Sequence, residues 1–282
     1  MGSYGELVGS GKVWMLPNRS GPVVNPRACD AASEQPESLL FPRRVSTIYP
    51  PMANGADICF VCEAREGGTY YCKTDKDGRE IRATEFLSAR LSEHVGIPTP
   101  FVSVLENDSG ATFFGSLAHT STASEFETRA YLSTPMKDEL GRPSGWVGQY
   151  LARVDVLDRF LNNPDRSFQN FILQDRKLCA IDFAAVRLMD LSTERFPVEK
   201  TPTVSLRSFA RKTHGPHPAF AKEMVDRIAG VPIEAIEGFL KEMPADWLTN
   251  EQREQLCEIW SGPKLQRRLA ALRADLKGEP QL

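Results

Sequence analysis

The hydrophobic pattern of this 282-residue chain changes once, near residue 120. Before that point, short β-prone runs come in two pairs, at residues 58–64 and 69–73 and again at residues 101–106 and 111–116. Each pair flanks a polar segment that contains glycine, which is the pattern of a β-hairpin. We therefore expect the first part of the chain to be built mainly from short strands.

One helix is predicted between the two hairpins. Apolar residues recur at helical spacing from Thr84 to Val95, and Gly96 should end the helix. Glu85 is expected in its first turn, where a carboxylate interacts favourably with the helix dipole. Residues 46–55, before the first hairpin, are expected to form a loop.

Beyond residue 124 the pattern is that of helices. Residues 146–161 carry apolar side chains at 3.6-residue spacing, and Pro164 should prevent this helix from continuing. Three more helices are predicted at residues 233–243, 250–260 and 263–277. Helices should therefore make up most of the second part of the chain.

These patterns predict an α+β fold with two lobes. Residues 39–118 would form a small strand-rich N-lobe, and residues 119–282 a larger, mainly helical C-lobe. Residues 1–38 are rich in Gly, Pro, Ser and Asn and have no periodicity, so we expect a flexible N-terminal arm there.

Charge and composition argue against several kinds of partner. The formal net charge is −3, without the basic excess that is typical of a nucleic-acid binder. No run approaches the roughly 18 apolar residues that a membrane span requires. We expect a cytoplasmic protein with no direct nucleic-acid or membrane partner.

The six cysteines are scattered and are expected to be reduced thiols rather than zinc ligands.

The stretch DRFLNNPDRSFQNFIL, residues 158–173, carries the most specific pattern. Asp165 and Asn170 in it have the D-x-x-x-x-N spacing of a kinase catalytic loop, and Asp182 follows an apolar run as the metal aspartate of a D-F-G segment does. A hairpin turning at residues 174–177 would bring Asn170 and Asp182 to neighbouring strand ends. They would then be close enough to share one metal ion.

Phosphoryl transfer from a nucleotide needs charges held in place more than it needs covalent chemistry. A lysine must hold the phosphates, carboxylate and amide oxygens must hold Mg²⁺, and an aspartate must face the attacking hydroxyl. The candidates for these tasks are Lys73 with Glu85, Asn170 with Asp182, and Asp165. Structural alternatives exist: Asp165 could cap a turn, Asn170 could form an Asx turn, and Glu85 could be solvated.

Two further groups of polar residues have weaker signals. Asp158 precedes Asp165 by seven residues on the predicted helix, and is either a structural partner for Arg166 or backbone amides or a chemical group. His214 and His217 are interpreted as part of a polar loop.

The segments NNPDRSFQNFIL, AIDFA, YYCK and ATEFLSARLSEHVGIPTP together resemble the HipA-like kinases. The loop of that family reads N-x-D-R-x-x-x-N, and its nucleotide lobe carries a lysine followed by a glutamate-containing run that ends in G-x-P. The C-terminal MPADW and LQRRLAALRADL are similar in style to the family's helical ending. The resemblance extends over residues 40–277.

The resemblance implies a two-lobed protein-kinase-like fold that uses ATP and Mg²⁺. In several relatives it implies phosphorylation of Ser or Thr on a protein, sometimes as the toxin of a toxin–antitoxin pair, so a protein substrate and an antitoxin-like partner are expected. It also implies that the segment Gly115-Ser116-Leu117 is the adenine hinge.

The resemblance also assigns roles to the five polar candidates. It implies that Asp165 is the catalytic base and that Lys73 binds the phosphates with Glu85 as its partner. Asn170 and Asp182 would be the metal ligands and contribute to cofactor binding.

Two positions depart from the kinase pattern. Ala184 stands where a glycine follows Asp-Phe, and residues 46–55 contain no G-x-G-x-x-G. Two other functions therefore stay open: a pseudokinase that binds a nucleotide without turning it over, and a phosphotransferase that acts on a small molecule or lipid headgroup. The destination of the phosphate would separate these functions.

Overall fold

The computed structural model describes residues 42–50, 57–118, 122–135, 145–174, 177–193, 196 and 200–278. The expected N-terminal arm, residues 1–38, lies outside the described residues, as do residues 51–55 of the expected loop. The boundary predicted between residues 118 and 119 stays a prediction.

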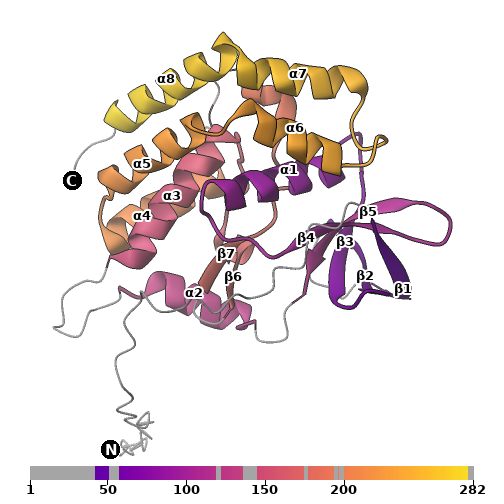
Figure 1. Ribbon diagram of the computed structural model, residues 1–282. Coiled ribbons are helices and arrows are strands. Elements are labelled where there is room, and N and C mark those ends of the chain that lie inside the picture. The colour runs from indigo at the N-terminus through magenta and orange to yellow at the C-terminus, as the bar shows by residue number, and fades with distance from the viewer. Residues whose placement is uncertain are drawn as a thin grey trace, which may run out of the picture. The chain divides into compact units, whose positions relative to one another are not determined.

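Five strands of the first part form a closed barrel in the order β1-β2-β3-β5-β4 (Figure 1). Their bounds are Arg43–Tyr49 for β1, Ile58–Ala64 for β2, Thr69–Lys73 for β3, Val102–Glu106 for β4 and Thr112–Leu117 for β5. Neighbouring strands are antiparallel except β1 and β4, whose parallel pairing closes the barrel. Both predicted hairpins, β2–β3 and β4–β5, are therefore confirmed.

Strand β1 corrects the expected loop, because residues 46–49 belong to it. Only Arg43 and Val45 are buried in this strand, and the side chains from Ser46 to Tyr49 are exposed. Its sequence therefore lacks the apolar alternation by which a half-buried strand is found. Pairing on both sides, with β2 and with β4, holds this segment extended.

Helix α1 spans Ile81–His94 and begins three residues before the predicted start. Asp75 explains the early start, because its carboxylate accepts a hydrogen bond from the backbone amide of Arg82 (3.0 Å), one of the first-turn amides without a partner in the helix. The prediction that Glu85 lies in the first turn is therefore wrong. Glu85 lies one turn further along the helix, where it is buried.

The described residues of the second part contain seven α-helices and two short 3₁₀ helices, Phe168–Asn170 and Leu188–Ser192. The bounds of the α-helices are Glu125–Ser133 for α2, Trp146–Phe160 for α3, Pro202–His214 for α4, Pro218–Ala229 for α5, Ile233–Glu242 for α6, Asn250–Ser261 for α7 and Pro263–Gly278 for α8. The predictions of α3, α6, α7 and α8 are confirmed within a few residues. Of the predicted polar loop at residues 214–217, residues 215–217 form the short connection between α4 and α5, whereas His214 is the last residue of α4.

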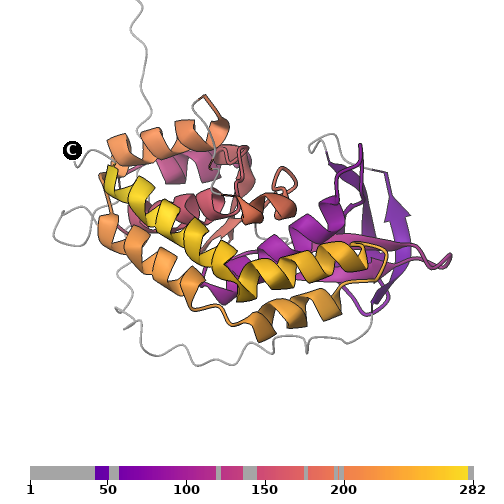
Figure 2. The same cartoon turned by 90° about the horizontal axis from the view of Figure 1, so that it is seen from above.

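A two-stranded hairpin follows α3. Its strands are β6 (Phe171–Gln174) and β7 (Lys177–Ala180), and pairing from Phe171–Ala180 to Gln174–Lys177 confirms the predicted hairpin. Figures 1 and 2 both place this hairpin between the barrel strands and the group formed by α3, α4 and α5.

Two cores support these elements. Side chains from four barrel strands fill a small core: Val45, Cys62, Ala64, Tyr70, Cys72 and Leu105. A larger core joins α1, the inner faces of β4 and β5, the β6–β7 hairpin and the helices of the second part. The five described cysteines are free thiols, in line with the expectation from the sequence, and Cys29 lies outside the described residues.

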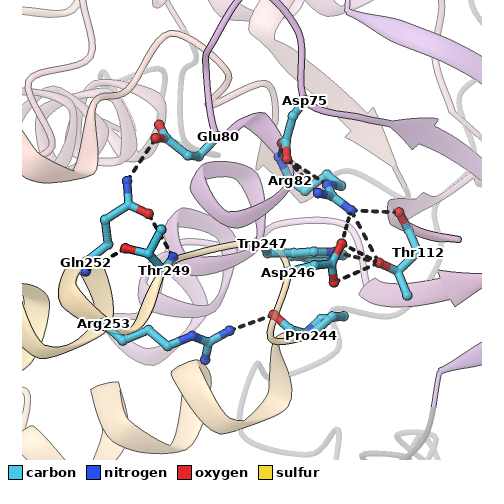
Figure 3. Close-up of polar contacts among 10 residues, drawn as sticks. All are labelled: Asp75, Glu80, Arg82, Thr112, Pro244, Asp246, Trp247, Thr249, Gln252 and Arg253. Carbon is cyan, nitrogen blue, oxygen red and sulfur yellow. Dashed lines mark hydrogen bonds and ion pairs between the residues drawn. The ribbon is translucent and has the colours of Figure 1, made fainter.

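The connection between α6 and α7 binds the start of α1 and the start of β5 (Figure 3). Arg82 forms ion pairs with Asp75 (2.7 Å) and Asp246 (2.9 Å), and its guanidinium lies over the ring of Trp247. The Trp247 indole donates a hydrogen bond to Thr112 Oγ1 at 2.9 Å. The start of α1 is thus tied to a segment more than 150 residues later in the chain.

None of the described helices is long and apolar enough to cross a membrane.

Candidate active site

Three of the predicted residues meet at the point where β3, α1 and the segment after β7 come together. Lys73 is the last residue of β3, and its ammonium lies 2.5 Å from Glu85 Oε1 and 2.9 Å from Asp182 Oδ1. The Lys73 side chain is 11% exposed and that of Glu85 3%, whereas that of Asp182 is 42% exposed. The cluster is therefore buried at Glu85 and open at Asp182.

Two carboxylates share one ammonium in this cluster, and their pKa values reflect it. Burial raises the pKa of Glu85, and the Lys73 charge offsets part of that rise. Burial alone would also raise the pKa of Asp182, but the ion pair and hydrogen bond with Lys73 outweigh it and lower the pKa. Burial alone would lower the pKa of Lys73, but the charges of Glu85 and Asp182 outweigh it, so the pKa of Lys73 is raised. Lys73 is therefore charged and Asp182 ionised at neutral pH.

The backbone of Asp182 adopts a left-handed conformation, with φ of 61°. Aspartate tolerates this region better than most residues, but at a cost of about 1–3 kcal/mol that the surroundings must offset. The contact with Lys73 and the backbone amide of Ala184, which also lowers the Asp182 pKa, are two such surroundings. Strained residues of this kind concentrate at functional sites.

Asp165 lies in the loop between α3 and β6. It is exposed, and its backbone amide donates to Asn163 Oδ1 (3.2 Å). Partial burial raises the pKa of Asp165, and the charge of Asp182 raises it further. Its carboxylate accepts no hydrogen bond from the described residues, so it is available to a ligand hydroxyl.

Asn170 ends a single 3₁₀ turn, residues 168–170, and is buried. Its side-chain oxygen accepts a hydrogen bond from Ser167 (2.6 Å), and its backbone oxygen accepts one from the amide of Ile181 (3.0 Å). Asn170 is therefore bound to the residue just before Asp182. The predicted proximity of the two strand ends is present in the structure.

A buried ion pair supports this loop. Arg166 donates to both carboxylate oxygens of Asp158, at 2.9 and 3.0 Å, and each side chain is 1% exposed. Burial raises the Asp158 pKa, and the Arg166 charge offsets part of that rise. Asp158 is thus the structural partner of Arg166, one of the two interpretations that the sequence left open.

Arg166 also joins the segment that contains Asn170 to the segment that contains Asp182. Its guanidinium donates to the backbone oxygens of Asn170 and Ile181, and its backbone amide donates to Thr203 Oγ1 at 2.9 Å. Sequence reasoning missed these contacts. The only signal was Arg166 itself, an arginine beside the candidate base and eight residues after an aspartate of the same motif.

The segment Gly115-Ser116-Leu117 does not form the turn that a hinge would suggest. It lies within β5, paired with Tyr70, Tyr71 and Cys72 of β3. A Cβ atom at Gly115 would lie 2.5 Å from Leu105 Cδ1, so the glycine is required for barrel packing. A contact between this segment and adenine stays a prediction.

Asp182 and Asn170 have the chemistry of a magnesium site. Mg²⁺ takes oxygen ligands, binds through one or two protein carboxylates and keeps other positions for water and phosphate oxygens. The open, ionised Asp182 beside Asn170 fits that donor set. No group of three or more His, Cys, Asp and Glu that could hold a metal occurs among the described residues, so a cage made entirely of such side chains is not the arrangement here.

The comparison with protein families identifies the chain. The model of the HipA-like kinase family matches residues 45–275, and the chain therefore belongs to that family. Among proteins with curated descriptions, none matches this sequence.

Two solved structures are similar to this chain, and one of them supports the same fold. The Helicobacter pylori proinflammatory kinase CtkA is 9% identical, with a TM-score of 0.55 over 83% of this chain and 97% of CtkA. HipA from Shewanella oneidensis MR-1, solved with HipB and operator DNA, is 13% identical, with a TM-score of 0.46 over 85% of this chain and 68% of HipA. The match to CtkA and the family model together support a mixed α/β fold like that of a HipA-like kinase.

Proposed function

We propose that this protein is a kinase that transfers the γ-phosphate of ATP, with Mg²⁺, to a Ser or Thr hydroxyl of a protein. In this proposal residues 39–118 and 119–282 are the two lobes of a protein-kinase-like fold. Membership of the HipA-like kinase family supports a phosphotransferase. The observation that carries the proposal is the Lys73 ammonium, held between the buried Glu85 and the open Asp182.

The cluster suits a nucleotide because its charges are held in place before the ligand arrives. Glu85 holds Lys73 at the end of β3, from where the ammonium can contact phosphate oxygens. Asp182 is ionised and solvent-facing, so its carboxylate and the side-chain oxygen of Asn170 would hold Mg²⁺. Bound Mg²⁺ would neutralise the charge that develops on the phosphoryl oxygens.

Asp165 would act as the base. Its carboxylate accepts the proton of the substrate hydroxyl while that oxygen bonds to the γ-phosphorus. The bond from the γ-phosphorus to the bridging oxygen breaks, and ADP leaves with the electron pair. The raised pKa of Asp165 makes its carboxylate a better proton acceptor than an ordinary aspartate.

Three finer parts of the proposal rest on the resemblance to the family. Gly115, Ser116 and Leu117 would lie against the adenine, as residues at the end of β5. An antitoxin-like protein would be the partner, and the protein would act in the cytoplasm. Each of these statements is part of the proposal.

The test follows labelled γ-phosphate from Mg²⁺-ATP into a cell lysate that is then separated into protein and small-molecule fractions. The wild type is compared with Asp165→Asn and with the control Asp108→Asn, whose carboxylate lies on the exposed β4–β5 turn and pairs with Arg65. We expect label in a protein band with wild type and with Asp108→Asn, and none with Asp165→Asn. Phosphoamino-acid analysis of that band should give phosphoserine or phosphothreonine.

Label found only in the small-molecule fraction would contradict the protein substrate and favour a small-molecule or lipid-headgroup phosphotransferase. No label in either fraction, with ATP binding intact, would indicate a pseudokinase. Equal labelling by wild type and Asp165→Asn would remove Asp165 from the role of base.

A further inference from the structure

The four helices α3, α4, α5 and α8 enclose a cavity that is separate from the Lys73 cluster. Its volume is about 530 Å³, and it is lined by residues of α3, α4, α5 and α8 and by Arg166 and the connection between α4 and α5. These four helices are neighbours in Figure 1, and contacts between α3 and the other three agree with that view. None of Lys73, Glu85, Asp165, Asn170 and Asp182 lines it.

The charge of the lining is opposite to that of the whole chain. Six basic side chains line the cavity: Arg166, Arg207, Arg211, Lys222, Arg273 and Lys277. One of them, Arg166, is balanced by its ion pair with Asp158. The acidic side chains of the lining are two, Asp155 and Asp158, so positive charges exceed negative ones by four, whereas the chain has a formal net charge of −3. A cavity with this excess favours an anion.

The rest of the lining is largely apolar. Leu151 and Val154 of α3, Leu206 of α4, Val225 of α5 and Leu276 of α8 all face it. The volume lies within the roughly 300–1,000 Å³ of typical small-molecule sites, which combine apolar walls with a few polar groups that orient the ligand. The cavity therefore suits a ligand with an apolar body and one charged end.

Arg207 is the group that would receive the charged end. Its Nε donates to Asp155 (2.7 Å), and its side chain is 17% exposed. Its Nη2 is buried and has no hydrogen-bond partner among the described residues. Asp155 also pairs with Arg159 (3.0 Å), so one carboxylate serves two guanidinium groups. A buried donor of this kind is costly unless an acceptor reaches it.

We propose that this cavity binds an amphipathic organic anion, with its apolar body between α3, α4, α5 and α8 and its anionic head on Arg207. The head is a carboxylate or a phosphate, and the body is an acyl or alkyl chain. Binding of this ligand does not depend on the kinase function proposed above.

The cavity also shares a wall with the loop that carries Asp165. Thr203 lines the cavity, and its hydroxyl accepts from the Arg166 amide (2.9 Å) and donates to the Asn163 oxygen (2.7 Å). Arg166 lines the cavity as well and holds Asn170 and Ile181 from the other side. The ligand should therefore change the stability of this loop, and its effect on catalysis rests on the proposed function.

The binding test uses calorimetry with three probes of one chain length: decanoate, decyl phosphate and the neutral decan-1-ol. The variant Arg207→Met removes the proposed head-group contact, and Ala210→Trp fills the cavity. Lys212→Met is the matched control, because Lys212 is exposed on the same helix and does not line the cavity. Circular dichroism melts check that each variant is folded.

We expect decanoate or decyl phosphate to bind wild type and Lys212→Met equally, and to bind Arg207→Met at least tenfold more weakly. Decan-1-ol should bind at least tenfold more weakly than the better anion, and Ala210→Trp should bind neither anion. Failure of both anions to bind wild type would overturn the proposal, as would equal binding of decan-1-ol or undiminished binding by folded Ala210→Trp. If neither variant folds, the comparison of anions with decan-1-ol on wild type decides.

The coupling to the loop is measured separately by amide hydrogen exchange of wild type with and without the bound anion. We expect at least a twofold change in exchange rate at Arg166, whose amide is held by Thr203, and no change at the distant β4–β5 turn. Unchanged exchange at Arg166 with the cavity saturated would overturn the coupling. This readout needs no catalysis, so it separates failure here from failure of the proposed kinase function.

Discussion

Two ionic groups of this protein lie close together in the fold but differ in their charge balance and in their exposure to solvent. In the Asp158–Arg166 pair one carboxylate meets one guanidinium, and both side chains are 1% exposed. In the Glu85–Lys73–Asp182 cluster two carboxylates share one ammonium, and Asp182 is 42% exposed. The first group is balanced and closed, and the second has an excess negative charge at an open carboxylate.

This difference distinguishes an ion pair that stabilises the fold from a cluster that can bind a ligand. A buried pair with its hydrogen bonds satisfied has no capacity left for a ligand, but losing one partner leaves an uncompensated buried charge. An open carboxylate with a lowered pKa can still accept a cation. Arg166 links the two groups, because its guanidinium also holds the backbone oxygen of Ile181, next to Asp182. Four predictions test this difference.

The largest effect is expected at Asp182. Asp182→Asn removes the anionic oxygen that would face Mg²⁺, so kcat for phosphoryl transfer should fall by about 10³-fold or more, a loss of the size seen when a preorganised charge contact is removed. Its melting temperature should stay close to that of wild type, since the side chain is partly exposed. Steady-state kinetics with labelled ATP provide the check. Retention of full activity would show that the metal assignment is wrong.

Asp158→Asn should act mainly on stability. It leaves the Arg166 guanidinium buried without its counter-charge, which typically costs about 3–5 kcal/mol. Urea unfolding measures this loss, and Asp226→Asn is the matched control, because Asp226 pairs with Arg273 at an exposed position and should cost less than about 1 kcal/mol. Equal stability of the two variants would contradict the supporting role of Asp158.

Glu85→Gln tests the cluster at its buried end. The variant keeps the shape of the side chain but removes the carboxylate that holds Lys73, leaving the ammonium to Asp182 alone. We expect kcat/KM for ATP to fall by about tenfold, which corresponds to about 1.4 kcal/mol. Kinetics at varied ATP concentration measure it. An unchanged kcat/KM would indicate that Glu85 does not position Lys73.

The smallest effect concerns pH. In the proposed function Asp165 would act as a base in its ionised form. Burial and the Asp182 charge raise its pKa, so transfer should be lost, as pH falls, at a higher pH than for an ordinary aspartate. Asp57 also raises this pKa, more weakly. In Asp57→Asn the acid limb of the kcat profile should therefore move slightly to lower pH. A shift to higher pH would contradict the assignment.

The sequence predicts the elements whose signal is local. The two barrel hairpins, α3 and the β6–β7 hairpin have clear periodicity and turn residues, and they place Lys73 at a strand end and Asn170 next to Asp182. Strand β1 could not be predicted, because its exposed residues carry no alternation. The early start of α1 depends on Asp75, six residues before the helix, and therefore moved Glu85 out of the first turn.

The features that the sequence does not predict are contacts between segments far apart in the chain. The direct contact of Lys73 with Asp182 spans 109 residues, and that of Arg166 with Thr203 spans 37. Neither belongs to a motif that fixes the spacing. Arg207 and the basic lining of the cavity likewise come from helices α4, α5 and α8 and from the loop before β6, and only the packed fold brings them together.

The most direct test of the central claim, that the open carboxylate of the Lys73 cluster is where the metal–nucleotide complex binds, is ATP binding with and without Mg²⁺. Calorimetry would compare wild type, Asp182→Asn and the control Asp108→Asn. We predict that Mg²⁺ strengthens ATP binding to wild type and Asp108→Asn by at least about tenfold, and that Asp182→Asn loses this enhancement. The same enhancement in all three proteins would contradict the claim.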